Sequence, residues 1–229
     1  MKYLSILLLY IISSSCAVYA PNSLNVTGFS DRGQIALSAN AGNGINLQAA
    51  YALTNNIGAM VNYMNTNQIV ESDGVKRDGS GNLLEAGLGY FKNTKDNFRM
   101  EVFAGYGQGS VNITKTNADT RNFSTNANRL FLQPSIGYAH TNFEVFFSTR
   151  LANVNFNSIN TTYTPQDLEA DSFVKIDEQA WLFLEPAVTL RAGIRNVKLQ
   201  LQVGRSIKLK SDKLGYDSGL VNIGAFAKF

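Results

Sequence analysis

The 229-residue chain contains one cysteine, one histidine, one tryptophan and four prolines. One cysteine excludes an intramolecular disulfide framework, and one histidine excludes a metal site built mainly from cysteine and histidine. Charged residues make up only 16% of the chain, whereas roughly 25% is usual in soluble domains. The net charge is +3, and no basic cluster forms the footprint of a nucleic-acid groove. We therefore predict no nucleic-acid partner.

Glycine and two aromatic residue types are plentiful, with 19 Gly, 10 Tyr and 14 Phe. Hydrophobic residues reach 45%, which is enough for the core of one domain of ordinary size. The mean hydropathy is close to zero, at -0.09, so the chain is not a bundle of membrane helices. This composition favours many strands joined by tight turns.

The first residues read as a secretory signal peptide over residues 1–15. Lys2 is followed by an apolar run from Tyr3 to Ile12 and by three serines, which is the order of a signal sequence. The run is too short to span a membrane. The only cysteine, Cys16, follows directly and resembles the lipidated first residue of a bacterial lipoprotein, although Ser13 stands where Leu is usual.

We therefore predict a lipidated Cys16 that begins a polar N-terminal tether over residues 16–32. Cleavage after Ala20 is the alternative, and Pro21 directly after that bond disfavours it.

From Gly33 to Phe229 the chain keeps a period of two, which is the pattern of half-buried strands. Residues 98–106 illustrate it, because Phe98, Met100, Val102, Ala104 and Tyr106 alternate with polar or small residues. The pattern predicts an all-β fold, a closed antiparallel transmembrane barrel of ten strands over residues 33–229. Eight strands is the alternative if the first pair lies outside the wall.

Charged residues within the strand centres fall on the face opposite the apolar stripe. We predict that they project into a narrow lumen and pair there, since unpaired charges would be costly. The predicted lumen charge network comprises Glu85, Arg99, Glu101, Arg129, Glu144, Arg150, Glu185, Arg191 and Lys198. Four aromatic residues point inward in the same register and favour a filled lumen: Phe103, Phe131, Phe146 and Phe183.

Three features indicate that the apolar face points outward. Short links alternate with longer ones, as short periplasmic turns alternate with outer loops in membrane barrels. Six aromatic residues of the apolar stripe gather near the short turns or the C-terminus, as in an interfacial girdle: Tyr51, Tyr90, Phe98, Tyr138, Phe143 and Phe229. The chain also ends on Phe229 within an alternating strand, which resembles the insertion signal of outer-membrane barrels. An even strand number predicts that both termini, the N-terminus included, are periplasmic.

The segments Cys16–Asn22 (CAVYAPN), Gln48–Leu53 (QAAYAL) and Phe131–Tyr138 (FLQPSIGY), together with the Phe229 end, carry a resemblance. The chain resembles a small outer-membrane β-barrel protein of Bacteroidota with a lipoprotein-type signal peptide. The resemblance implies a cell-envelope location in the bacterial outer membrane and a barrel architecture. It supplies no substrate and no active-site residues.

Other candidate sites fit their chemistry poorly. Asp167, Glu169 and Asp171 stand at alternate positions, as oxygen ligands do in calcium loops, but Ser172 occupies the place that requires glycine. These three are the only metal candidates, and we predict no metal and no cofactor. His140 lies beside a short turn rather than at the outer rim, so we predict no catalytic residue. Pro134 and Pro186 lack a ladder donor, and a bulge or bend is expected at each.

We expect an outer-membrane barrel lipoprotein that is not an enzyme. Its expected role is binding or scaffolding, as an accessory subunit of a larger outer-membrane complex and in contact with outer-membrane lipids. A narrow selective pore for a small solute is the alternative. A soluble barrel that binds an apolar ligand inside stays open as a further reading.

Overall fold

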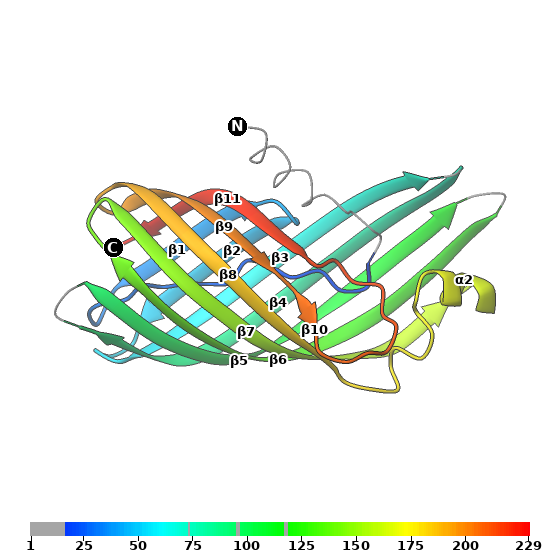
Figure 1. The fold of residues 1–229 in the computed structure, drawn as a ribbon, viewed down its shortest axis with the longest axis horizontal. Coiled ribbons are helices and arrows are strands. Elements are labelled where there is room, and N and C mark those ends of the chain that lie inside the picture. Colours follow the sequence, from blue (N-terminus) through cyan, green and yellow to red (C-terminus); the bar gives the residue numbers. More distant parts are fainter. Residues whose placement is uncertain (1–16, 73, 95–96, 117–118) are drawn as a thin grey trace.

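A computed structural model describes residues 17–72, 74–94, 97–116 and 119–229 (Figure 1). The wall strands are β1 (Ile35–Ala41), β2 (Ile45–Ala52), β3 (Ile57–Ser72), β4 (Val75–Asn93), β5 (Phe98–Thr116), β6 (Thr120–Ala139), β7 (Phe143–Thr161), β8 (Trp181–Ile194), β9 (Val197–Arg205) and β11 (Gly219–Lys228). Each strand pairs antiparallel with the next, and β11 pairs with β1. The predicted ten-stranded closed barrel is therefore confirmed. The two-residue β10 (Ile207–Lys208) follows β9 and also pairs with β8.

The outward face of the barrel carries a continuous apolar belt. On β5, Met100 and Val102 are 50% and 44% exposed, between Phe98 at one edge and Tyr106 at the other. Nine residues of a tilted strand rise by roughly 20 to 25 Å, which matches the apolar band of outer-membrane barrels. Polar residues replace apolar ones on the same face beyond Tyr106, beginning with Gln108 and Asn112.

The barrel is much longer on one side than on the other. Strands β3 to β7 contain 16 to 20 residues, whereas β1 and β2 contain 7 and 8. The expected longer links after the third and fifth strands are mostly continued strands, because β3 pairs with β4 as far as Ser72 and Val75, and β5 with β6 as far as Thr116 and Thr120. These hairpins project past the belt at the end we call the long-loop end (Figure 1).

The opposite end, the short-turn end, carries the aromatic residues expected there. Phe98 and Tyr138 face each other across β5 and β6 with ring centroids 5.6 Å apart, and Phe143 follows at 5.7 Å from Tyr138. Phe229 is 62% exposed and pairs through its backbone with Ile35. The C-terminus therefore lies at the short-turn end (Figure 1).

The two prolines act differently from the expectation of a bulge. Leu132 pairs with Leu151 and Ser135 with Ser148, so the β6–β7 register is unchanged across Pro134. Pro186 pairs in register with Thr149 of β7. On the other side of β8, residues from Ala187 onward pair with β9, and Leu184 and Phe183 pair with β10. Pro186 lies at the gap between these two pairings, where its missing N–H interrupts the ladder. A register shift instead occurs on β6 between Ser124 and Asn126.

The prediction of a polar tether over residues 16–32 is the one that differs most from the structure, because most of this segment is buried inside the barrel. Residues 18–29 lie inside the barrel, drawn in dark blue along its length in Figure 1, and all of them except the half-buried Ala20 are buried. Residue 17 lies near the long-loop end, so the described N-terminal end and the C-terminus are at opposite ends. Strand parity does not detect this, because a segment ahead of the first strand can cross the lumen. Among the described residues, no helix is long and apolar enough to cross a membrane.

The apolar belt predicts the effect of charge on β5. Val102→Arg places a charge near the middle of the belt and should lower the free energy of unfolding by about 2–4 kcal/mol in a bilayer. Urea unfolding of the barrel in phospholipid vesicles measures this. Asn112→Arg, on the same strand and face but beyond the belt, should change it by less than about 1 kcal/mol. Equal effects at both positions would contradict a lipid-facing belt.

Candidate functional site

The lumen is occupied by the N-terminal segment, which we call the lumen segment (residues 17–30). It runs from the long-loop end to the short-turn end and then enters β1. Leu24, Val26 and Thr27 are fully buried, and Phe29 is 1% exposed. Among the described residues, the segment forms no ladder with a wall strand; one isolated bridge joins Tyr19 to Tyr216, which lies in the connection before β11.

Wall side chains bind the main chain of the lumen segment. Gln202 accepts a hydrogen bond from the Leu24 N–H (2.8 Å) and donates one to the Leu24 carbonyl (3.0 Å). Asn46 accepts from the Ser23 N–H, and Gln48 donates to the Ser23 carbonyl at 2.7 Å. These contacts satisfy backbone groups that would otherwise be buried without partners.

The same arrangement continues toward the short-turn end. The Asn25 carbonyl accepts from Gln133 at 2.8 Å, and the Val26 carbonyl from Arg191 at 2.6 Å. Glu101 accepts from the N–H groups of Thr27 and Gly28, both at 3.1 Å. Lys228 donates to the Gly28 carbonyl at 2.7 Å. The interior polar residues therefore form a binding site for an extended polypeptide backbone.

A first charge cluster surrounds the N-terminal half of the lumen segment. Arg129 pairs with Glu85 at 2.6 Å and donates to the hydroxyl of Tyr19 at 3.0 Å. Tyr19 donates in turn to Glu185 at 2.6 Å. Asn22 accepts from Arg129 and Arg150 and donates to Glu85 at 2.8 Å. The cluster thus joins four wall strands through two residues of the lumen segment.

A second cluster lies nearer the short-turn end. Glu144 receives Arg191 at 2.8 Å, Lys198 at 2.7 Å and Lys228 at 3.4 Å. The Arg191 guanidinium also stacks on Phe226, with 3.4 Å from its central carbon to the ring centroid. Arg99 is placed apart from both clusters. It is half-buried and donates to Asn93 and to the Phe98 carbonyl.

Glycines in the wall make room for the large lumen side chains. A Cβ at Gly105 would lie 2.5 Å from the Phe131 ring, and one at Gly107 would lie 2.7 Å from Glu85 Cγ. Both distances are below ordinary van der Waals contact. The glycine-rich stretch from Gly105 to Gly109 therefore relieves crowding inside the barrel.

The long-loop end is closed by a cap, which we define as residues 162–180 and 209–218. Its core is apolar and includes Phe173, Ile176 and Leu214, packed against Phe123 of β6 and Val18 of the lumen segment. Trp181 donates its indole N–H to the Ile176 carbonyl at 2.8 Å. The cap and the lumen segment therefore share one hydrophobic cluster.

Ion pairs hold the cap helix α2 (Pro165–Ala170) to the long strands. Thr164 and Asp167 form a capping box at its start. Asp167 pairs with Lys115 of β5 at 2.6 Å and with Arg121 of β6, and Asp171 pairs with Arg77 of β4 at 3.0 Å. The hydrogen bonds from Lys115 and Thr164 hold the pKa of Asp167 below its ordinary value.

The three metal candidates do not converge. Asp167 and Asp171 bind cations of different strands, and Glu169 is exposed on α2. Within the described ranges, no three His, Cys, Asp or Glu side chains are placed to hold a metal ion.

His140 is exposed at the short-turn end, 5.2 Å from the Phe143 ring. Cys16 and the predicted signal peptide lie outside the described residues.

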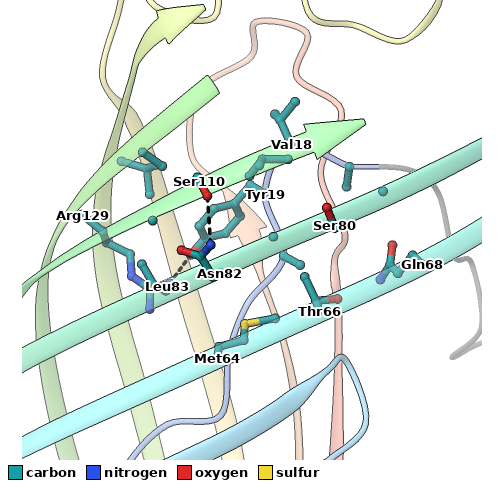
Figure 2. Close-up of a pocket in the computed structure, with 18 residues that line it drawn as sticks. Val18, Tyr19, Met64, Thr66, Gln68, Ser80, Asn82, Leu83, Ser110 and Arg129 are labelled. Carbon is teal, nitrogen blue, oxygen red and sulfur yellow. Dashed lines mark hydrogen bonds between the residues drawn. The ribbon is translucent and has the colours of Figure 1, made fainter. Parts of the chain in front are cut away.

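A small cavity remains where the lumen segment meets the long strands (Figure 2). It has a volume of about 70 Å³. Val18 and Tyr19 border it on one side, and Met64, Thr66 and Leu83 on the other. Gly79, Gly81 and Gly109 supply no side chains to fill it. The cavity is much smaller than the several hundred Å³ that a typical small-molecule site occupies.

Sequence reasoning found the inward charges and missed what they bind. A signal was present, because residues 17–30 contain no charged side chain and include Val18, Tyr19, Leu24, Val26 and Phe29. An exposed tether has no reason to carry so many apolar residues without charge. The wall glutamines Gln48, Gln133 and Gln202 were a second signal, since amides serve main-chain donors and acceptors equally.

No family model matches the chain, and no curated protein does. Among solved structures, it is similar to the translocator domain of the autotransporter NalP from Neisseria meningitidis, with 11% identity, a TM-score of 0.50 and coverage of 86% of each chain.

A major outer membrane protein from Thermus thermophilus aligns with 10% identity and a TM-score of 0.42, over 86% of this chain and 99% of that one. CarO2 from Acinetobacter baumannii aligns with 12% identity and a TM-score of 0.38, over the same shares. The likeness to the NalP translocator domain shows the fold alone, that of an outer-membrane β-barrel.

The first charge cluster predicts a large penalty for removing one partner. Glu85→Leu leaves the buried Arg129 without its carboxylate and should lower the free energy of unfolding by about 3–5 kcal/mol. Glu178→Leu is the control, because Glu178 and Lys175 form an exposed pair that contributes at most about 1 kcal/mol. Urea unfolding in vesicles compares the two. A loss at Glu85 no greater than at Glu178 would show that the cluster does not stabilise the barrel.

The cap should loosen in acid. Because the pKa of Asp167 is lowered in the folded protein, its stabilisation is complete above the unfolded value of about 3.9 and is lost as the pH falls below it. The emission of Trp181, the single tryptophan, should shift to longer wavelength below pH of about 4. Asp167→Asn should show the shift already at neutral pH, and Asp212→Asn, an exposed cap residue, should behave as the native chain. A native emission spectrum for Asp167→Asn would refute the role of this carboxylate.

Proposed function

We propose that this protein is a closed barrel of the bacterial outer membrane that acts by binding or scaffolding, as an accessory subunit of a larger outer-membrane complex. It is neither a channel nor an enzyme in this proposal. The main support for the proposal is that the lumen segment fills the barrel. Its main chain is bound by side chains of β2, β5, β6, β8, β9 and β11. A lumen filled in this way leaves the outer surfaces for function.

The membrane location is supported by the outward face. Leu88, Leu130 and Leu199 are 62%, 58% and 72% exposed, which a water-facing barrel would not tolerate as part of a continuous belt. An open sheet edge is excluded in lipid, and the pairing of β1 with β11 leaves none there. The aromatic residues gathered at the short-turn end, such as Phe98, Tyr138 and Phe143, match an interfacial girdle.

The proposed orientation in the membrane is supported by the difference between the two ends of the barrel. Short turns are periplasmic and longer connections are external in outer-membrane barrels, which supports an external position for the cap and the β3–β7 extensions. A Bacteroidota source and lipidation of Cys16 belong to the same proposal and rest on the sequence alone.

Binding of an apolar ligand inside a soluble barrel has less support. The interior is lined by charged and amide side chains that already bind the lumen segment or one another. The cavity of about 70 Å³ beside Val18 and Tyr19 is too small for such a ligand. A narrow pore likewise needs a free path, and Phe103, Phe146 and Phe183 are fully buried in the interior.

Purification in mild detergent from native outer membrane tests the proposal. An affinity tag inserted in the exposed residues 211–213 leaves Phe229 free. We expect the full chain to co-purify with a stoichiometric partner and to give no steady single-channel steps in a planar bilayer. Reproducible steps from the purified barrel would establish the pore instead. A lone barrel without partner would overturn the accessory-subunit role.

A further inference from the structure

The two ends of the lumen segment are fixed to different ends of the barrel. At its start, Val18 donates to the Gly215 carbonyl at 3.0 Å, and the Tyr19 carbonyl accepts from Asp217 N–H at 2.8 Å. Both partners belong to the cap. At its finish, Ser30 donates to Gln34 at 2.8 Å and Gly33 to the Ala52 carbonyl at 2.8 Å, at the short-turn end. The chain therefore runs from the long-loop end toward the short turns.

The length of the segment agrees with a complete crossing. Residues 18 to 29 span at most about 36 Å, the length of a fully extended chain at about 3.3 Å per residue. This exceeds the roughly 25 Å height of an apolar belt and leaves enough chain to reach the cap.

The start of the segment is part of the packed interior rather than a disposable leader. The Tyr19 ring stacks on Phe183 with centroids 4.2 Å apart. Its hydroxyl joins Glu185 at 2.6 Å to Arg129 at 3.0 Å, and all three side chains are buried. Cleavage after Ala20 would remove this ring, and Glu185 and Arg129 would each lose the hydrogen bond to the Tyr19 hydroxyl. The packing therefore favours a mature chain that retains Val18, Tyr19 and Ala20.

We propose that the protein is threaded through its own barrel, so that Ala17 and the N-terminal end are displayed on the outer face of the membrane. The inference rests on the outer-membrane placement proposed above. It also moves the expected anchor. If Cys16, a residue outside the described part of the chain, carries an acyl chain, that anchor would then be on the outer side of the membrane rather than in the periplasm.

The wall contacts explain how such threading is stabilised. The contacts to Ser23, Leu24, Val26 and Gly28 are made with main-chain atoms, so an extended chain can be bound along its whole length. Asn22 and Tyr19 then fix the position of the segment along the axis, because their side chains join the first charge cluster.

Thiol labelling on intact cells tests the sidedness. Three variants carry a new cysteine: Ala17→Cys in the lumen segment, Asp212→Cys in the cap and Thr141→Cys in a short turn. The native chain serves as the blank for Cys16. The probe is a membrane-impermeant biotin maleimide, applied before and after lysis.

We expect both Ala17→Cys and Asp212→Cys to react on intact cells, Ala17→Cys to a smaller extent because residue 17 is half-buried and Asp212 is exposed. Thr141→Cys should react at least about tenfold more after lysis than before it. Reaction of Asp212→Cys without Ala17→Cys would overturn the threading while leaving the barrel's orientation intact. Reaction of Thr141→Cys alone would overturn both the orientation in the proposed function and the outer display.

The mass of the intact native protein gives a second, independent check that needs no variant. We expect a mature chain that begins at or before residue 17. A chain that begins at Pro21 would refute the inference, because the residues that reach the cap would be absent.

Discussion

Every buried main-chain group needs a hydrogen-bond partner, and this requirement shapes the whole interior of the barrel. The wall strands satisfy most of each other's backbone groups through the closed ladder, and one exception is the Ala49 carbonyl of β2, which accepts from the Asn25 side chain. Between Ser23 and Gly28 the main chain of the lumen segment is therefore bound by wall side chains, such as Gln202, Gln48 and Glu101. At its start, Val18 and Tyr19 bind the main chain of the cap instead. This requirement accounts for the polar residues that line the interior.

The charged residues of the interior follow from the same constraint. A buried ion pair contributes little by itself because desolvation opposes it. Here Arg129 and Arg150 bind Asn22, and Arg191 binds the Val26 carbonyl, in addition to their carboxylates. Charge and peptide backbone are satisfied together, which gives the lumen segment one position. The cap shares its apolar cluster with Val18 and Tyr19. The same hydrophobic contacts therefore fill the lumen and close the long-loop end.

Much of the wall could be predicted from residues alone. The alternation of Phe98, Met100 and Val102 has the period of a strand, and strand period does not depend on distant contacts. The turn-end aromatics and the short links then distinguished outside from inside. A bulge or a bend was expected at Pro134 and at Pro186. The bulge is absent from both, because the neighbouring ladder is interrupted beside each proline without a change of register. The expected loops after β3 and β5 proved to be strands, since polar residues such as Asn112 pair equally well above the belt.

The amino-acid sequence alone determines the strands and their number, the outward apolar belt and the inward direction of the charges. It can do so because alternation is a local property of the chain. What fills the lumen, which end of the barrel the N-terminal segment reaches and which groups the charges bind became clear only from the folded chain. Residues 17–30 have no period and no motif, and their partners lie up to 200 positions away, as Gly28 and Lys228 do. Contacts of that range exist only once the barrel has closed around the segment.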